Sequence, residues 1–479
     1  MILKTVKGSE DLDRARSRNS LAELYEKQGK FEDAELFYER ALNVREASLG
    51  RHHPQVASSL SNLAGLLYAQ GKYAEAEPLY ERSQAIQEKV LGPEHPDVAT
   101  TLNNRAELLR AQGKYDEADP LYARVLQILA ATVGEEHPNY ASALNNRAEL
   151  LRDQGKYAEA DSLYKRSQDI REKMLGPEHP DVAATLNNRA GLLCAQGKYA
   201  EAEPLYERSQ AIQEKVLDPE HPDVATTLNN RAELMEILGK YEQAIPLHVR
   251  ANKIWEAALG PDHPDVAAGL SNWAKLLRAQ GKYAEADHLY LRAIKIGEKT
   301  LGPDHPALAT RLNNRAELLT MQGKYEEAKP LYRRSLAIDE RVHGPDHPEV
   351  ATDLNNWAKL LRDQGEYAEA ELFYERCQRI WERVLGPEHP RLAATLNNRA
   401  ELLIDQGKHT EAVELLEKAL TIRSTKLGED HPHTMNTRTL LQQVRAMGSA
   451  ASSGSSAEPS DDDTSSATGG VEEVKAMYK

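Results

Sequence analysis

The sequence predicts an all-α fold, a right-handed α-solenoid (superhelix) of about ten helix-turn-helix units followed by a C-terminal capping helix. Two observations support this prediction. A sequence motif recurs every 42 residues along most of the 479-residue chain, and the apolar residues inside each repeat follow the helical period. The chain has 40% hydrophobic residues but only three Phe and four Trp, which suits many small interlocked cores.

The 42-residue period is kept without insertion or deletion. The stretch LNNRAELLRAQGKYDEADPLY begins at Leu102, and LNNRAELLRDQGKYAEADSLY begins at Leu144. A His-Pro pair keeps the same step, from His53-Pro54 to His431-Pro432. One glycine recurs in every block, at Gly29, Gly71, Gly113, Gly155, Gly197, Gly239, Gly281, Gly323, Gly365 and Gly407. Each unit must therefore contact its neighbours in the same way.

Two helices fit inside each block. Leu102, Ala106 and Leu109 fall at i, i+4 and i+7 and form the buried stripe of a first helix, A, which Gly113 ends. The buried face of a second helix, B, is predicted from the spacing of Tyr115, Ala118, Tyr122, Val125 and Ile128. The alanine of helix B recurs in all ten units, from Ala34 to Ala412, and indicates close approach of two helix axes.

The joint between units carries signals for a helix end and a helix start. A glycine such as Gly92 suits a left-handed C-cap, and Asp218 replaces it once as a tolerable left-handed residue. Pro96 fits the first position of the next A helix, and Asp97 lies favourably near the positive end of its dipole. The histidine before each proline lies in a separate unit, and stacking separates neighbouring copies by roughly 10 Å. No shared metal ion is expected.

The ends of the chain differ from the repeats. We expect an N-terminal segment at residues 1–9, ten repeat units at residues 10–430 and a capping helix at residues 431–447. Residues 448–479 are small, polar and acidic, and we expect this tail to be disordered because it cannot bury enough apolar surface.

The repeat resembles that of a known family. Residues at the small, apolar and aromatic consensus positions of a tetratricopeptide repeat (TPR) are Ala106, Leu109, Gly113, Tyr115, Ala118 and Tyr122. The LNN stretch and the LGPEHPDVA joint make this 42-residue form similar to the kinesin light chain type, over about residues 10 to 447. The resemblance implies that asparagines on the concave A helices contact a peptide, and that a basic residue three positions before the glycine recognises acidic cargo.

The candidate peptide-binding residues are therefore the paired asparagines and the arginines of the A helices. A column of carboxamides also matches the backbone of an extended peptide from chemistry alone, although the same column could bridge adjacent repeats. The candidates are Asn62, Asn103, Asn104, Arg110, Asn145, Asn146, Arg152, Asn187, Asn188, Asn229, Asn230, Asn272, Arg278, Asn313, Asn314, Asn355, Asn356, Arg362, Asn397 and Asn398.

Other positions depart from the family pattern. The basic residue is kept in four units only, and Glu26 and Glu236 reverse its sign. A second basic position of the family is kept as Arg45, Arg171 and Arg423, whereas Trp255 and Trp381 replace it elsewhere, either as packing or as a ligand platform. Preference for a tryptophan-plus-acid peptide is therefore not expected.

Arginines also interrupt the buried stripe of helix A, where the family keeps leucine. Our hypothesis is a ladder in which these guanidinium groups pair with the Glu107-type carboxylates of neighbouring A helices, since a buried guanidinium needs a partner. The six arginines are Arg105, Arg147, Arg189, Arg231, Arg315 and Arg399.

These patterns predict a non-enzymatic protein-interaction scaffold that binds extended peptide or protein segments in a concave groove. The alternatives are a ligand-sensing arm related to NB-ARC-TPR receptors, although the chain has no G-x-x-x-x-G-K-[ST] loop, or a kinesin-type cargo adaptor. Fewer than twenty residues precede the first repeat and no heptad run exists, so a kinesin heavy chain is not an expected partner. Every polar feature is repeated or isolated, whereas an active site is a unique constellation, so no catalysis and no cofactor are expected.

Composition limits the compartment and the partners. The net charge of −15 argues against a nucleic-acid partner. No apolar stretch approaches the ~20 residues that span a bilayer. Cys194 and Cys377 offer no disulfide framework. We therefore expect a cytoplasmic protein without a membrane partner.

Overall fold

The computed structural model describes residues 2–453, and residues 454–479 of the expected tail lie outside the described residues. Within this range the chain forms helices and no strand. The helices are α1 (Ile2–Lys27), α2 (Phe31–Leu49), α3 (Pro54–Ala69), α4 (Tyr73–Leu91), α5 (Pro96–Ala111), α6 (Tyr115–Thr132), α7 (Pro138–Asp153), α8 (Tyr157–Leu175), α9 (Pro180–Ala195), α10 (Tyr199–Val216), α11 (Pro222–Ile237), α12 (Tyr241–Leu259), α13 (Pro264–Ala279), α14 (Tyr283–Thr300), α15 (Pro306–Met321), α16 (Tyr325–His343), α17 (Pro348–Asp363), α18 (Tyr367–Val384), α19 (Pro390–Asp405), α20 (His409–Leu427) and α21 (Pro432–Ser453).

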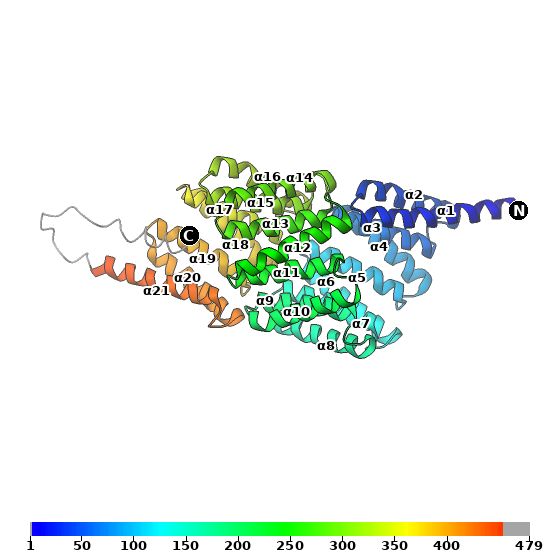
Figure 1. Ribbon diagram of the computed structural model, residues 1–479, viewed down its shortest axis with the longest axis horizontal. Helices are drawn as coiled ribbons and strands as arrows, with labels where there is room; N and C mark the ends of the chain where they lie inside the picture. Colours follow the sequence, from blue (N-terminus) through cyan, green and yellow to red (C-terminus); the bar gives the residue numbers. More distant parts are fainter. Residues whose placement is uncertain (1, 454–479) are drawn as a thin grey trace.

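The helices stack as hairpins in one continuous solenoid (Figure 1). We number the hairpins as units 1 to 10, from α1–α2 to α19–α20, so that odd helices are A helices and even helices are B helices. Each B helix packs on its own A helix and on the next one. Neighbouring A helices also touch one another from α3 to α19, without comparable contact between neighbouring B helices among the described residues. The A helices therefore lie on the inner, concave side of the curve.

The two ends extend the expected elements. Helix α1 runs from Ile2 to Lys27, so the segment expected at residues 1–9 is continuous with the first A helix. Helix α21 ends at Ser453, beyond the boundary expected at residue 447, and no B helix follows it among the described residues. It packs on α20 through Leu440, Leu441 and Val444, which are at most 9% exposed. This contact covers the last apolar face of the described solenoid.

The predicted stripes form the core. Leu102, Ala106 and Leu109 of α5 are at most 2% exposed, and Tyr122 of α6 is fully buried. The alanine of helix B is fully buried in all ten units, at Ala34, Ala76, Ala118, Ala160, Ala202, Ala244, Ala286, Ala328, Ala370 and Ala412. The all-α solenoid predicted from the period is confirmed.

Each A helix ends in a Schellman motif. The N–H of Lys114 donates to the carbonyl of Leu109 at 2.8 Å, and the N–H of Gly113 donates to that of Arg110 at 3.0 Å. Gly113 has a φ of 69°, in the left-handed region that glycine adopts without strain. This turn delivers Tyr115 to the start of helix B and fixes the hairpin geometry.

Each B helix ends differently from the sequence-based expectation. The expected left-handed cap would have a ψ near 50°, whereas Gly92 has a φ of 95° and a ψ of 152°. That combination belongs to a region open almost only to glycine. Asp218 takes the equivalent place with a φ of 114°, the one positive φ of a non-glycine residue among the described residues.

The histidine before each proline is a helix cap, which the sequence analysis did not predict. In α5, His95 Nδ1 accepts a hydrogen bond from the N–H of Asp97 at 3.1 Å, and Pro96 occupies the first turn. The same bond recurs in every A helix from α3 to α19 and in α21. The ring must keep Nδ1 unprotonated in order to accept this bond.

Successive turns of the superhelix touch through these caps. His305 Nε2 lies 3.0 Å from the carbonyl oxygen of Ala69, and His347 Nε2 lies 3.1 Å from that of Ala111; each pair is 236 residues apart in the chain. Because Nδ1 accepts from the backbone, Nε2 carries the proton and donates to the carbonyl. A Cβ on Gly71 would lie 2.5 Å from Pro306, so the glycine of the hairpin turn also permits this approach.

Acid should weaken this contact between turns. Burial lowers the pKa of His347 to about 3 and that of His389 to about 4, and it lowers the pKa of His305. Since these folded values lie below the ordinary value of 6.5, the unfolded chain binds more protons on acidification. The stability that these neutral histidines give the folded state is therefore complete above about pH 6.5. It is lost as the pH falls toward 4, by about 3 kcal/mol for His389 alone.

Thermal melting by circular dichroism between pH 7.5 and 5 measures this loss. His347→Asn keeps a capping side chain that does not titrate, so its melting temperature should fall less with acid than that of the wild type. His95→Asn, at a cap outside the contact between turns, is the matched control and should leave the acid dependence unchanged. An acid dependence of His347→Asn equal to that of the wild type would contradict the assignment.

The strained aspartate gives a second prediction. Asp218→Gly should stabilise the protein by about 1 kcal/mol, because glycine adopts the positive φ without steric strain. The stretch from Gly71 recurs from Gly197 with Gly92 changed to Asp218, so Gly92→Asp is the reciprocal variant and should destabilise by a similar amount. Urea unfolding of both variants measures the two changes, and shifts in the same direction would refute the prediction.

Candidate peptide-binding surface of the A helices

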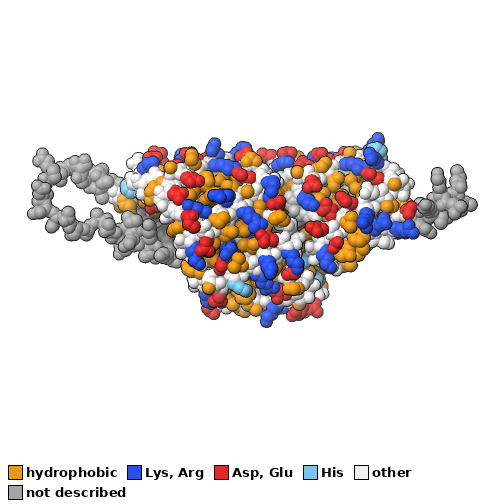
Figure 2. Space-filling view, turned by 90° about the horizontal axis from the view of Figure 1, so that it is seen from above, with side chains coloured by type: hydrophobic (Ala, Val, Ile, Leu, Met, Phe, Trp, Pro, Cys, Tyr) orange, Lys and Arg blue, Asp and Glu red, His pale blue; other side chains and the backbone are white. Residues whose placement is uncertain are grey.

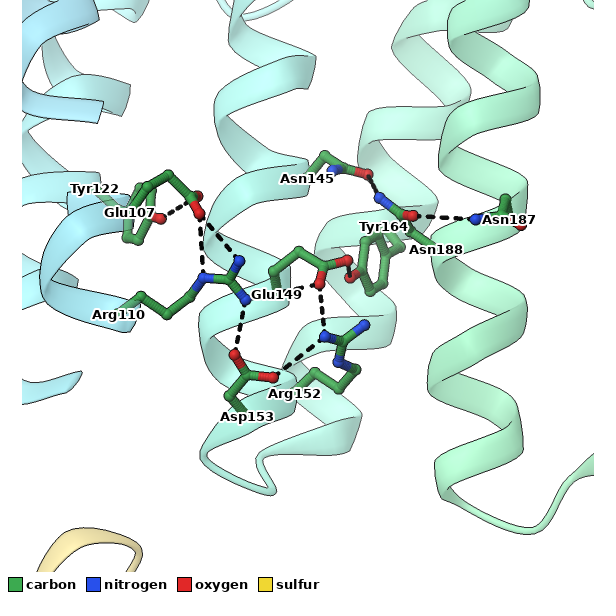
Figure 3. A network of polar contacts seen from close by, with 10 residues as sticks. All are labelled: Glu107, Arg110, Tyr122, Asn145, Glu149, Arg152, Asp153, Tyr164, Asn187 and Asn188. Carbon is green, nitrogen blue, oxygen red and sulfur yellow. Dashed lines mark hydrogen bonds and ion pairs between the residues drawn. The ribbon is translucent and has the colours of Figure 1, made fainter. Parts of the chain in front are cut away.

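The paired asparagines form a ladder across neighbouring A helices. The second asparagine of one unit donates from Nδ2 to Oδ1 of the first asparagine in the preceding unit, as from Asn146 to Asn103 at 2.9 Å and from Asn188 to Asn145 at 3.5 Å. Figure 3 shows Asn188 between Asn145 and Asn187. The further ladder bonds join Asn62 to Asn19, Asn230 to Asn187, Asn272 to Asn229, Asn356 to Asn313 and Asn398 to Asn355.

Two predicted asparagines lie outside this bonding pattern. Asn104 has no ladder bond, because the unit before it carries Ser61 at the position of the first asparagine. Asn314 has no ladder bond for the same reason, because the unit before it carries Ser271. At the C-terminal end, Asn397 donates to Glu401 at 3.0 Å and accepts from the hydroxyl of Thr437 at 3.2 Å. The bridging role considered from the sequence is therefore present at most junctions, and Asn104 and Asn314 are free of it.

The ladder bonds leave some donors and acceptors of the asparagine carboxamides unused. A carboxamide has two N–H donors and an oxygen with two acceptor sites, and a ladder bond takes one donor from the second asparagine. Most of these side chains are half-buried, while Asn145, Asn229 and Asn313 are buried. A peptide lying over the A helices would thus meet amide groups already held in fixed orientations.

The predicted arginines are engaged by carboxylates of the chain itself. Arg110 lies 2.7 Å from Asp153 and 3.0 Å from Glu107, and 3.8 Å from Glu149 of the next unit. Burial lowers the pKa of Arg110, but Glu107 and Asp153 raise it to a greater extent. Figure 3 shows this network, in which the hydroxyl of Tyr122 also donates to Glu107.

The other three predicted arginines follow the same pattern. Arg152 lies 2.7 Å from Glu149, and Arg278 pairs with Glu317 of the next unit. Arg362 pairs with Glu401 of the next unit. Each of the four arginines is therefore paired with a carboxylate of the chain itself, and their role as peptide-binding residues stays a prediction.

The arginines at the second basic position of the family also form hydrogen bonds with groups of the chain itself. Arg171 is 6% exposed and donates to the hydroxyl of Thr185 and the carbonyl of Asp181. Arg423 is equally buried and donates to the carbonyl of His433. Arg45 donates to Ser59 at 2.6 Å. These arginines join one B helix to the next A helix, and Arg45 also lines a pocket together with Arg16 and Gln55.

The two tryptophans at this position pack in the core. Trp255 is 5% exposed and Trp381 is 3% exposed. Trp255 lies over Gly269, where a Cβ would come within 2.5 Å of the indole ring. The packing alternative considered from the sequence agrees with this geometry.

The arginine ladder exists, but its partners were predicted wrongly. Arg189 lies 2.8 Å from Asp161, which belongs to the B helix of the preceding unit. The same B-helix pairing occurs for Arg105 with Glu81, Arg147 with Asp119, Arg231 with Glu207, Arg315 with Asp287 and Arg399 with Glu371. The Glu107-type carboxylates are instead bound by Tyr122 and Arg110 in unit 3 and by the equivalent pair in unit 4, so they cannot serve the ladder.

Among the described residues, no group of three or more His, Cys, Asp or Glu side chains is arranged to hold a metal ion, and no helix is long and apolar enough to cross a bilayer. Acidic and basic side chains are intermixed on the face drawn in Figure 2.

Comparison with known proteins decides the family. A family model described as tetratricopeptide repeat matches residues 13–89, 55–131, 97–173, 139–215, 181–251, 223–272, 265–341, 311–383, 354–425 and 391–448. The chain belongs to the tetratricopeptide repeat family. Its TPR units keep the 42-residue step that the kinesin light chain resemblance implied.

Several solved structures are similar to this TPR chain. One is a Podosopora anserina protein likened by name to kinesin light chain, with nearly identical TPR-like repeats (28% identity, covering 43% of this chain and 97% of that one, TM-score 0.36). Others are BtubC from P. vanneervenii (20% identity, 57% and 95% coverage, TM-score 0.38) and yeast Tom70 (16% identity, 91% and 96% coverage, TM-score 0.41). A search of curated proteins found no match.

The charged network predicts a stability effect. Arg110→Ala leaves three neighbouring carboxylates without their shared cation, so the TPR array should be destabilised by about 1–3 kcal/mol. Urea unfolding at neutral pH measures this change. Arg379→Ala is the control, because Arg379 bonds only a carbonyl of its own helix. Equal effects of the two substitutions would show that the network contributes nothing.

Proposed function

We propose that this TPR protein is a non-enzymatic scaffold whose concave A helices hold an extended segment of a partner protein. The asparagine ladder is the observation that carries this proposal. It places a row of oriented amides along the inner side of the solenoid, and amides match the alternating donors and acceptors of an extended backbone.

The arrangement of charge supports main-chain recognition. The arginines expected to read acidic side chains are neutralised by Glu107, Glu149 and their equivalents, so acidic side chains of a peptide find no cation there. Affinity on this surface would come from the amides, and selectivity from the positions that differ between units.

Two pairs of asparagines separate binding from bridging. Asn104→Ala with Asn314→Ala removes two amides that have no ladder bond, so binding should weaken at unchanged stability. Asn146→Ala with Asn398→Ala removes two amides that donate ladder bonds of 2.9 and 3.0 Å. This second pair should weaken binding and also destabilise the fold, by about 1 kcal/mol for each bond.

Affinity capture from a cell extract, quantified by mass spectrometry, tests the proposal beside thermal melting of each variant. Asn43→Ala with Asn139→Ala is the matched control, because these two amides are exposed and outside the ladder. The same captured proteins at the same yield from all variants would rule out the amide surface as the binding site. A loss confined to the destabilised pair would assign the asparagines to bridging alone.

A further inference from the structure

The glutamate six residues before the hairpin glycine normally has several donors within the chain. Glu149 accepts from the hydroxyl of Tyr164 on its own B helix, pairs with Arg152 of its own A helix and lies 3.8 Å from Arg110 of the preceding unit. Arg278 of unit 7 binds Glu317 of unit 8 in the same register. The solenoid thus defines three places from which this carboxylate is stabilised.

In unit 6, all three donors are missing from Glu233. The arginine of its own helix is replaced by Glu236, and the arginine of the preceding unit by Cys194. The tyrosine of its B helix is replaced by His248. Asn229 remains as a hydrogen-bond donor at 3.3 Å, and neither glutamate forms an ion pair with a described residue. We refer to Glu233 and Glu236 as the acid pair.

His248 does not substitute for the lost tyrosine. Its imidazole is fully buried, and neither ring nitrogen has a hydrogen-bond partner. It lies on α12 at the place from which the hydroxyls of Tyr122 and Tyr164 reach the equivalent carboxylates. Burial lowers the pKa of His248 to about 4, so the ring is neutral at pH 7 and supplies no charge to the acid pair.

The place of the missing arginine is lined by small residues. Cys194 is short, and Gly191 stands beside it where unit 4 has Glu149. A Cβ on Gly191 would meet only the hydroxyl of Tyr206 within 4 Å, at 3.6 Å. Glycine within a helix is destabilising by about 0.5–1 kcal/mol relative to alanine, and no packing contact requires it here. Next to the acid pair, these two small residues occupy less volume than the arginine and the glutamate that hold the equivalent positions in unit 4.

The acid pair is electrostatically under-compensated. Burial raises the pKa of Glu233 and of Glu236. Lys275 of the next unit opposes this for both glutamates, and Arg278 of the next unit also opposes it for Glu236, but only in part. Because Glu233 carries less compensation than Glu149 or Glu317, a cation brought by another molecule would gain the attraction that an arginine supplies elsewhere in the solenoid.

We infer that unit 6 binds an arginine or lysine side chain of a partner protein, which takes the place of the arginine missing at Cys194 and pairs with Glu233 and Glu236. The partner segment is basic, opposite in sign to the acidic cargo that the family resemblance implies. The net charge of −15 on this chain favours the same kind of partner, because complementary charge steers association. This inference rests on the proposed binding role of the concave surface.

A fluorescein-labelled peptide of alternating arginine and serine tests the inference by fluorescence polarisation, beside a peptide with glutamate in place of each arginine. The wild type should bind the arginine peptide and not the glutamate peptide. Glu233→Gln with Glu236→Gln should weaken binding at least tenfold. Cys194→Arg should also weaken it at least tenfold, because the new side chain fills the site, and should raise the melting temperature by restoring the internal ion pair.

Glu401→Gln is the matched control, since Glu401 is already paired with Arg362, and binding should stay within twofold of the wild type. Equal affinity of all variants for the arginine peptide would show general attraction to an acidic surface and would overturn the inference. Absence of binding, or binding of the glutamate peptide instead, would also overturn it. Neither result affects the amide surface, whose own test is the loss of captured proteins in the Asn104→Ala, Asn314→Ala variant.

Discussion

The fixed stacking offset between hairpins is the constraint on which the structure depends. Contacts recur at the same residue separations along the chain: 43 for Asn146 to Asn103 and for Asn188 to Asn145, and 236 for both His305 to Ala69 and His347 to Ala111. Such constancy requires that no unit gain or lose a residue, because one insertion would shift all later contacts out of register. The buried alanine of helix B sets this offset, since it lets neighbouring helix axes approach closely.

Variation between units is matched across each junction. Trp255 faces Gly269, and Gly297 leaves room for Arg311, whose Nη1 would lie 2.6 Å from an added Cβ. The equivalent residues elsewhere are Arg171 and Thr185, which hydrogen-bond each other. A large residue on one helix is thus accompanied by a small or hydrogen-bonding one opposite, so near-identical units can differ while their spacing stays constant. In unit 6 the volumes of facing residues still match, but the charges do not, because Glu233 lacks the donors that its equivalents have.

The inner surface combines a repeated part with a variable part. The amides are nearly the same in every unit and hold one another in place, which limits the entropy lost when a ligand binds them. The charged positions beside them differ from unit to unit, and most are balanced within the chain. A ligand therefore meets a uniform row of hydrogen-bonding groups with a few sites of net charge, and those few sites determine which side chains are accepted.

The sequence by itself determined the repeat, the helix boundaries within the repeat units and the buried stripes, because periodicity, glycine and proline act locally. It also identified the asparagine pairs and the arginines as a set. Only the tertiary structure decided their partners: Arg189 pairs with Asp161 on a B helix rather than with an A-helix carboxylate, and His347 meets the carbonyl of Ala111 across the turn of the superhelix. These outcomes depend on the curvature of the solenoid, which arises from small rotations added over several units and brings distant residues together, and no local pattern of residues encodes that sum.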